Sequence, residues 1–589
     1  MKTKLIRVVR KLQFQNKFHL KQQNAKHFAR LVRQLTELSN KSIILLIVLL
    51  LPASSLFAQP FDMILTGEPV LADIRFVSLE SGRGLLSFTP PLAPAKVENF
   101  LDSIDPSLLS GAALEAYYRI RRRLVPQAAL SFTSDIFTAF IDINATLEAR
   151  VRFNTDINWY PKYHTNAPLL SAPIRFFLGN ALQFYFEPIV MLPPHLFNEG
   201  NRFGINVMTN NSDIDVTLPY RAFIAAGGSW WNFQLGRDRL FWGTGNTGSL
   251  TFADYAPYFE FVRLSFFSRN FKYTLLVNQM PLDIRHGLIG PSTSPSRPPD
   301  WENGLTMTTQ RHFYLHRFDA SFFNNRLSIG IMEGAMIGNS ALELRFLNPL
   351  MIFHSFMSWL DYETWAGELR RGHMIGSFFS VEVNWNIVPS LSVYGQFLMH
   401  EFALPGEIHT TDHVAPNSLG FMAGLNFTRS FNVWGASFFL ESFYTFPFLH
   451  MTSTPFGSFI QMRRTSWREI GVQYYFIGYP RDTISLTLGA NLFRGDVLNI
   501  GGRFAWRAMG ERSTIIWDWD MDYTTNFDKR TPTGTAQHNF IATVTADWQA
   551  LPRLGFNGSI TGIVARNNRH ISGSGSAGGQ AAFSVTFSY

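Results

Sequence analysis

The chain has 589 residues, no cysteine, 16% charged residues and 15% aromatic residues, among them 56 phenylalanines. An average soluble domain carries about 25% charged residues, so this composition favours a protein whose surface alternates between two solvents. Its mean hydropathy of +0.01 means that the chain is not hydrophobic overall. Without cysteine it can form no disulfide and carry no lipid-modified N-terminus.

The net charge of +8 is concentrated at the N-terminus. Residues 1–41 carry eleven Lys or Arg residues and one acidic residue, Glu37, which makes this segment +10 and leaves −2 for the remainder of the chain. The basic excess therefore belongs to a leader and predicts no binding to nucleic acid.

The leader continues into SIILLIVLLLPASSLFA, which has an apolar core at residues 43–51, a helix breaker at Pro52 and a small residue at Ala58. A basic region, a short apolar core and a small residue at the end form a secretory signal peptide. Residues 1–58 therefore predict an exported protein that is cleaved after Ala58. An N-terminal anchor helix is the alternative, but the apolar run is shorter than the roughly 20 residues that span a membrane.

Residues 59–125 have the periodicity of short helices. Leu71, Ile74 and Val77 share one helical face, and Gly82 follows as a C-terminal stop. The segment 97–104 places apolar residues at i, i+3, i+4 and i+7, and a third segment closes on the arginines 121–123, which suit a helix C-terminus. These segments predict a periplasmic helical subdomain over residues 59–125.

From residue 126 to residue 589 the apolar period changes to two. In TLEARVRFN (146–154), VEVNWNI (381–387) and TISLTLGANL (483–492), apolar and polar side chains alternate, and in a strand they point to opposite faces. A soluble β-sandwich also alternates, but these segments often exceed the usual strand length of about five or six residues. Their apolar face is rich in aromatic residues and their polar face carries charges such as Glu148, Arg150 and Arg152, as in outer-membrane barrels. The pattern predicts an all-β transmembrane barrel of about 16–18 antiparallel strands with even strand number.

The C-terminal segment AAFSVTFSY places Phe583, Val585, Phe587 and Tyr589 in phase and ends on an aromatic residue. This is typical of the closing strand that the barrel-assembly machinery of bacteria recognises, and it predicts location in the bacterial outer membrane. Long polar connections at 289–304 and 401–418 are expected to be extracellular, because such barrels have short turns at the opposite end.

A glycine-rich stretch, LGRDRLFWGTGNTGSLTF (235–252), contains several residues of types that are common in catalytic and binding sites. A phosphate-binding loop needs Lys-Ser/Thr after its glycines and lies between a strand and a helix. Here no such pair follows and the flanking segments are predicted strands, so the stretch is interpreted as a structural bend that lines or plugs the barrel lumen.

The fuller stretch resembles the outer-membrane capsule-assembly family, the Wzi-like proteins. In that family a Gly-Arg strand runs into a W-G-x-G-x-x-G-S-L turn and then a strand with Ala-Pro. The matching residues are Gly236, Arg237, Trp242, Gly243, Gly245, Gly248, Ser249, Leu250, Ala256 and Pro257. A second similar stretch, EGAMIGNSALELRFLNPLMIFH, supplies Glu333, Gly334, Arg345, Asn348 and Pro349.

The resemblance implies a large barrel with a periplasmic helical bundle that helps hold capsule polysaccharide at the surface, without catalysis. The residues expected to bind carbohydrate or line the lumen are Arg237, Arg239, Trp242, Asp254, Arg345, Asn348, Trp517, Asp518 and Asp520. The last three belong to WDWDMDY, whose alternating aspartates lack the Gly and Glu of a calcium loop. A strand with its acidic residues toward the lumen is the alternative for that segment.

The predicted function is a non-catalytic barrel that binds or organises surface polysaccharide. The alternatives are a porin or uptake channel for small solutes and, third, an outer-membrane hydrolase, although the chain has no G-x-S-x-G and no H-E-x-x-H motif. No metal site and no cofactor are predicted. The expected partners are surface polysaccharide, outer-membrane lipids including lipopolysaccharide-like glycolipids, and the barrel-assembly machinery.

Overall fold

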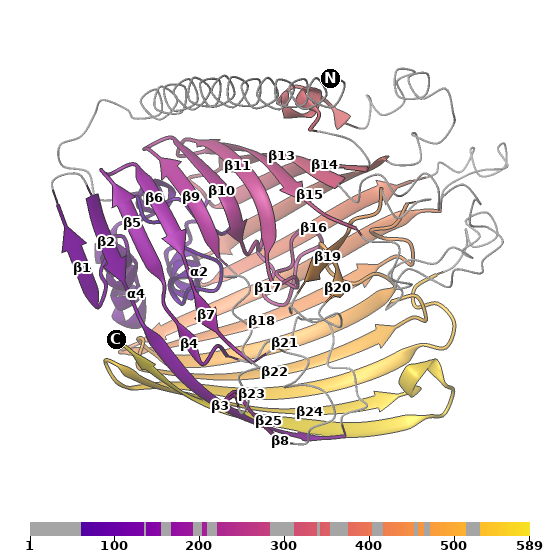
Figure 1. Cartoon of the computed structure of the whole chain (residues 1–589). Helices are drawn as coiled ribbons and strands as arrows, with labels where there is room; N and C mark the ends of the chain where they lie inside the picture. Colours follow the sequence, from indigo (N-terminus) through magenta and orange to yellow (C-terminus); the bar gives the residue numbers. More distant parts are fainter. Residues whose placement is uncertain are drawn as a thin grey trace, which may run out of the picture. The chain divides into compact units, whose positions relative to one another are not determined.

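The computed structural model describes residues 61–134, 137–154, 167–192, 203–208, 221–282, 311–338, 342–353, 375–402, 416–452, 457–464, 472–513 and 530–589. The leader, with its predicted signal peptide, lies outside the described residues. All helices and strands discussed below belong to one compact unit, Gln59–Tyr589 (Figure 1).

One antiparallel sheet forms most of this unit. Its first strands, most of them short, are β1 (Leu130–Thr133), β2 (Phe137–Ile141), β3 (Asn144–Phe153), β4 (Leu170–Ser171), β5 (Ile174–Leu178), β6 (Leu182–Phe186), β7 (Ile189–Val190), β8 (Phe203–Ile205), β9 (Ala222–Gly227) and β10 (Trp231–Asp238). The next are β11 (Phe259–Phe267), β12 (Phe271–Gln279), β13 (Arg311–Phe322), β14 (Leu327–Gly338), β15 (Ile375–Val388), β16 (Leu391–Glu401), β17 (Ser418–Phe431) and β18 (Trp434–Thr445). The last are β21 (Thr483–Arg494), β22 (Leu498–Met509), β23 (Gln537–Leu551), β24 (Leu554–Arg566) and β25 (Gly575–Ser588). A separate hairpin is formed by β19 (Ile460–Arg464) and β20 (Val472–Phe476).

The sheet closes on itself because the last strand pairs with an early one. Strand β25 pairs with β3 from Gly579↔Phe153 to Ser588↔Asn144, and β6 pairs with β9 on the other side of the short strands. The segments β2–β3, β4–β5 and β6–β7 act as three interrupted strands of the wall. With the ten strands β9–β18 and the five strands β21–β25, the described residues form a ring of eighteen strands, and the short strands β1 and β8 pair with β2 and β3. The predicted fold class, a barrel of about 16–18 antiparallel strands, is confirmed.

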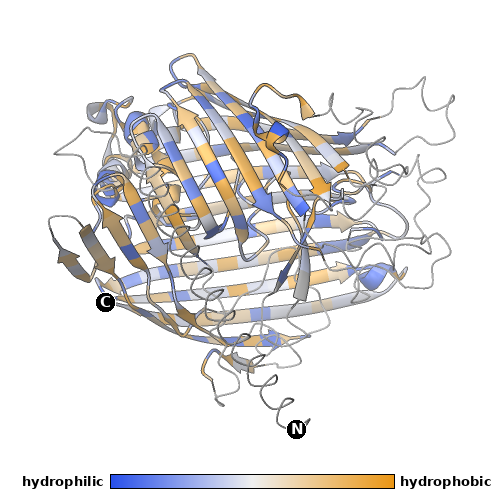
Figure 2. Ribbon diagram, turned by 45° about the horizontal axis from the view of Figure 1, so that its top comes forward, coloured by the Kyte–Doolittle hydropathy of each residue, from blue (hydrophilic) through white to orange (hydrophobic). Residues whose placement is uncertain are grey.

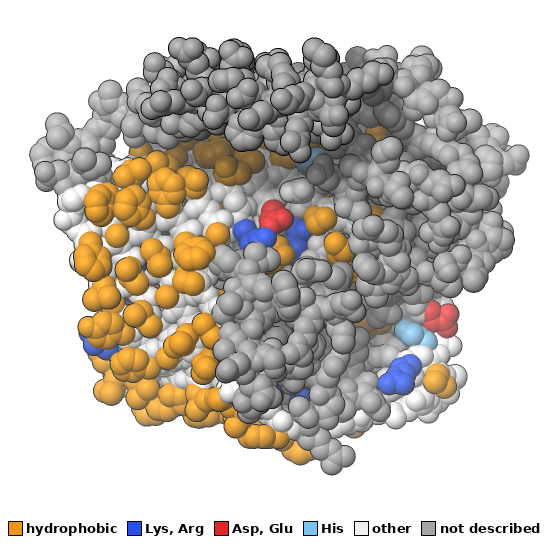
Figure 3. All heavy atoms as spheres, in the orientation of Figure 1, with side chains coloured by type: hydrophobic (Ala, Val, Ile, Leu, Met, Phe, Trp, Pro, Cys, Tyr) orange, Lys and Arg blue, Asp and Glu red, His pale blue; other side chains and the backbone are white. Residues whose placement is uncertain are grey.

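The period of two separates the lipid face from the lumen. On β15, Val383 and Trp385 are exposed, whereas Glu382 and Asn386 are buried inside. On β3, Glu148, Arg150 and Arg152 are buried as well. Figure 2 shows hydrophobic and hydrophilic residues mixed along the strands, and Figure 3 shows hydrophobic side chains spread over the outer face that it displays. Because one face of every strand must be apolar, this alternation also fixes the strand register.

Three α-helices of the described residues pack at the barrel end where the hairpin turns are short: α2 (Val70–Ser81), α3 (Pro94–Leu101) and α4 (Gly111–Arg123). Helix α2 ends as predicted at Gly82, which adopts a left-handed conformation with φ 64°. The amide of Ser390, in the turn between β15 and β16, donates to the Leu79 carbonyl at 2.7 Å, and the Gly84 amide donates to the Asn325 carbonyl at 2.6 Å. The C-terminus lies at the same end, where Tyr589 bonds to Ile143. The described part of the chain contains no helix long and apolar enough to cross a membrane.

Candidate functional site

The glycine-rich stretch is the connection between β10 and β11, at the barrel end opposite the helices. It folds back into the lumen instead of projecting from the wall. Trp242, Leu250 and Phe252 are each 0% exposed and belong to one core cluster with Phe313 of β13 and Met332 of β14. This part of the lumen is therefore packed like a protein interior.

Glycines let the bend turn inside so crowded a space. Gly243 has φ +139°, a conformation that L side chains rarely adopt. A Cβ on Gly245 would lie 2.1 Å from the Gly248 carbonyl oxygen, and a Cβ on Gly248 would lie 2.5 Å from the Tyr255 hydroxyl. The prediction of a structural bend inside the barrel agrees with this geometry.

Arg75 of α2 holds the carbonyl side of the bend. Its guanidinium donates to the Thr244 carbonyl at 2.9 Å and to the Gly245 carbonyl at 3.1 Å, and its Cζ lies 4.0 Å from the centre of the Phe88 ring. Burial lowers the pKa of Arg75 from its ordinary value. The nearby Tyr394, Glu441 and Glu382 favour the charged form and raise this pKa in part. Helix α2 is thereby tied to the tip of the bend.

Glu441 of β18 holds the amide side of the same tip. Its carboxylate accepts hydrogen bonds from the Asn246 amide at 2.7 Å, the Thr247 amide at 2.9 Å and the Tyr394 hydroxyl at 2.8 Å. The Asn246 side chain donates to Tyr394 and to Asn426 of β17, each at 2.9 Å. The guanidinium thus binds carbonyls and the carboxylate binds amides, so both polar sides of the backbone are satisfied away from water.

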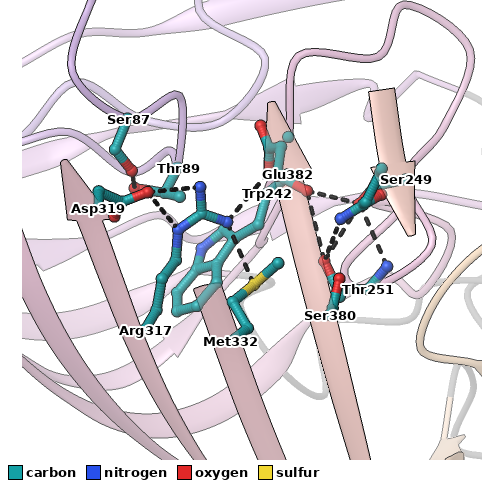
Figure 4. A network of polar contacts seen from close by, with 12 residues as sticks. Ser87, Thr89, Trp242, Ser249, Thr251, Arg317, Asp319, Met332, Ser380 and Glu382 are labelled. Carbon is teal, nitrogen blue, oxygen red and sulfur yellow. Dashed lines mark hydrogen bonds and ion pairs between the residues drawn. The ribbon is translucent and has the colours of Figure 1, made fainter. Parts of the chain in front are cut away.

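A second set of contacts fixes the base of the bend (Figure 4). Ser249 donates to the Trp242 carbonyl at 2.5 Å, and the Gln396 side-chain oxygen accepts from the Leu250 amide at 2.7 Å. Beside the indole of Trp242, Arg317 pairs with Asp319 at 2.7 Å and with Glu382 at 3.1 Å. All three charged residues are buried, so the ion pairs replace hydration that the lumen does not supply.

The predicted site residues of this stretch have structural roles. Arg237 forms an ion pair with Glu260, and Arg239 forms one with Asp254. An indole that is 0% exposed offers no face to a sugar ring, so Trp242 packs the lumen in place of the predicted carbohydrate contact. Arg237 and Arg239 keep part of each side chain exposed within these pairs, so their role in carbohydrate binding stays a prediction.

The remaining predicted site residues do not join this group. Arg345 and Asn348 lie in the segment 342–353, which packs through Phe346 against the outward-facing Tyr314, on the side of the sheet opposite the lumenal core. They are therefore not lumenal residues. Trp517, Asp518 and Asp520 lie outside the described residues. Within the described ranges no group of three or more His, Cys, Asp or Glu side chains is placed to hold a metal ion.

A cavity of about 1590 Å³ adjoins the bend, between helix α2 and the lumenal faces of β15–β18 and β21–β25. Amide and hydroxyl side chains from the wall line much of it, among them Asn384, Asn426, Asn491 and Thr428, together with the ring of Phe493.

The sequence analysis did not predict the roles of Arg75, Glu441 and Asn426. A lone acidic residue in the apolar run GASFFLESFYTF is the one local signal that pointed to Glu441.

No protein-family model matches the chain, and no curated protein matches it in sequence. In fold, the chain is similar to Wzi of Escherichia coli, an outer-membrane protein involved in group 1 capsule assembly and described as a carbohydrate-binding β-barrel. The TM-score is 0.54 at 14% identity, over 89% of this chain and 98% of that chain. With OprD of Pseudomonas aeruginosa the TM-score is 0.36 at 9% identity, over 77% of this chain and 93% of OprD. With OmpT of Vibrio cholerae the TM-score is 0.31 at 7% identity, over 78% of this chain and 100% of OmpT.

The likeness to Wzi concerns the fold. Closure of β25 on β3, the apolar outer face and that likeness agree with one another. The chain has the fold of a bacterial outer-membrane β-barrel.

Proposed function

We propose that the protein is a non-catalytic outer-membrane barrel of the capsule-assembly type that binds or organises surface polysaccharide. The observation that carries the proposal is the double clamp on the lumenal bend, with Arg75 on its carbonyls and Glu441 on its amides. The clamp holds the bend inside the lumen, across the space that a solute would have to pass.

Strand number makes this observation informative. Barrels of about 16 to 18 strands are wide enough to leave an aqueous channel. Here the lumenal faces of β11–β18 instead contribute apolar side chains to one core with the bend and with Leu449, Phe459 and Tyr479. Filling this half of the lumen supports a scaffold or binding protein over a pore.

The cavity beside the bend supports carbohydrate as the class of ligand. Side-chain amides and hydroxyls such as Asn384, Asn426 and Thr428 both donate to and accept from sugar hydroxyls, and the Phe493 ring offers an apolar face. Wzi, which shares this fold, is itself described as carbohydrate-binding and involved in capsule assembly. We extend that description to this chain as a proposal, with surface polysaccharide, outer-membrane glycolipids and the barrel-assembly machinery as its partners.

The test is the distribution of polysaccharide in a strain that produces both this protein and a surface polysaccharide. Deleting the gene should leave total polysaccharide unchanged and move a larger share of it from the cells to the medium. The full-length chain should restore retention, and a chain lacking residues 580–589, most of strand β25, should not, because the closing strand is incomplete. Unchanged retention in the deletion strain would contradict the proposed function.

A porin or uptake channel is the second candidate. It is favoured by one observation, namely that the lumenal residues of β23 and β24 are small and half-buried, such as Thr543, Thr545 and Thr561. A porin is expected to give large, stable conductance steps in planar bilayers, whereas the polysaccharide-binding barrel is expected to give little or none.

A further inference from the structure

The segment 342–353, which we call the outer flap, lies on the outside of the barrel wall. Strands β13 and β14 turn Phe313, Leu315 and Met332 into the lumenal core. Because neighbouring residues of a strand point to opposite faces, Tyr314 and Ala335 point outward, and these two residues pack against Phe346, Met351 and Phe353 of the flap. The flap therefore covers part of the face that elsewhere contacts lipid.

The wall beneath the outer flap carries polar groups that lipid could not satisfy. His316 and Tyr314 both face outward on β13, and both are buried by the flap. The His316 Nε2 lies 3.0 Å from the Phe346 carbonyl oxygen, and the Tyr314 hydroxyl accepts from the Glu343 amide at 2.8 Å. In a bilayer every unsatisfied polar group costs several kcal/mol, so the flap backbone supplies partners where water is absent.

The opposite surface of the outer flap is apolar and uncovered. Leu344 is 72% exposed and Leu350 is 86% exposed, with Leu342 and Ile352 also exposed. The two charges of the flap, Glu343 and Arg345, pair with each other at 3.4 Å and leave no net charge. Its 3-10 helix, η3 (Leu344–Leu347), directs the Phe346 ring against Tyr314 on the outer face of the wall.

This apolar surface continues the lipid-facing surface of the same strands, where Phe318 of β13 and Ile331 of β14 are exposed. Exposed apolar patches on proteins mark contact with a partner or a membrane. Continuity with the lipid-facing wall, neutrality of the charge pair and the polar groups hidden beneath all favour one occupant, the acyl chains of the surrounding lipid.

We propose that the outer flap is a membrane-inserted element whose leucines are covered by lipid acyl chains, and that it shields His316 and Tyr314 of the wall from them. Arg345 and Asn348 then belong to a lipid-contacting surface element, not to a carbohydrate site. The inference depends on the barrel fold alone and stands independently of the proposed function.

The absence of cysteine in the chain allows a clean test. Single variants Leu350→Cys and Leu344→Cys are spin-labelled in the full barrel, reconstituted in lipid vesicles. The measured quantity is the ratio of collision rates with oxygen, which is enriched in lipid, and with a water-soluble nickel chelate. Ile331→Cys on the outward face of β14 is the lipid-exposed control, and Leu108→Cys, 82% exposed in η1 (Pro106–Leu108) beside the helices, is the water-exposed control.

The proposal expects both flap labels to give the ratio of Ile331→Cys, severalfold above that of Leu108→Cys. A ratio equal to that of Leu108→Cys would overturn it, because the flap would then lie in water. Dipolar broadening that disappears on dilution with unlabelled protein would also overturn it, because a second copy would then cover the flap. Heat-modifiable migration of each labelled variant verifies that the barrel is folded.

Discussion

The strands β10–β18, one half of the ring, and the strands β23–β25 of its other half differ in what they present to the lumen. Strands β10–β18 present buried charged and aromatic side chains, among them Arg263, Arg317, Glu382, Tyr394 and Glu441. Strands β23–β25 present Thr543, Thr561 and Ser584, which are small and half-buried. Both halves have the same period of two, so alternation describes the outer surface and says little about the lumen. What the interior holds depends on which residues meet the bend.

The largest expected effect is on the bend itself. Gly245→Val places side-chain atoms where even a Cβ would lie 2.1 Å from the Gly248 carbonyl oxygen, so we expect loss of the folded barrel. Gly562→Val is the matched control, because nothing lies within 4 Å of its added Cβ on β24. Heat-modifiable migration of outer-membrane fractions measures both variants. Normal assembly of Gly245→Val would mean that the bend is not packed as described.

Removing the carboxylate of Glu441 is expected to have the next largest effect. Glu441→Gln turns an NH₂ group toward amides that need an acceptor, which costs about 3 kcal/mol of unfolding free energy if one charged hydrogen bond is lost. Asp547→Asn on β23 is the control from the other half, where the carboxylate accepts from Asn499 at 3.2 Å. Urea unfolding followed by heat-modifiable migration should separate the variants clearly. Equal losses would remove the distinction between the halves.

Arg75→Met tests the helix side of the clamp. Two backbone carbonyls lose a charged donor, so we expect about 2 kcal/mol of destabilisation and faster proteolysis of the helical segment in the folded barrel. Arg121→Met breaks a solvent-exposed ion pair with Asp102, and exposed pairs contribute little, so it should behave like the parent. Limited proteolysis with mass spectrometry gives the comparison, and identical cleavage rates would contradict the clamp.

Trp242→Phe should have the smallest effect of the set. The indole N–H has no hydrogen-bond partner among the described residues, so only packing is lost, at about 1 to 2 kcal/mol. Trp548→Phe, on the exposed outer face of β23, is the control. Polysaccharide binding should be unchanged in both variants. A selective loss of binding in Trp242→Phe would restore the carbohydrate role that the buried position argues against.

Local pattern predicted the barrel, the helices and the end of α2 at Gly82, because each depends on residues that are neighbours in the chain. Local pattern could not predict the clamp on the bend, because Asn246 and Glu441 are separated by 195 residues in the chain. Strand β13 shows why the outer flap was missed. In its first half the polar residues His312 and His316 suggest a lumenal face, yet Phe313 and Leu315 point inward, because the lumen beside them is an apolar core.

Single-channel recording in planar bilayers tests whether the clamped bend fills the half of the lumen that β10–β18 line. The purified full-length barrel is predicted to give little or no stable stepwise conductance. Large, reproducible conductance steps from the unmodified protein would contradict the account and favour the porin.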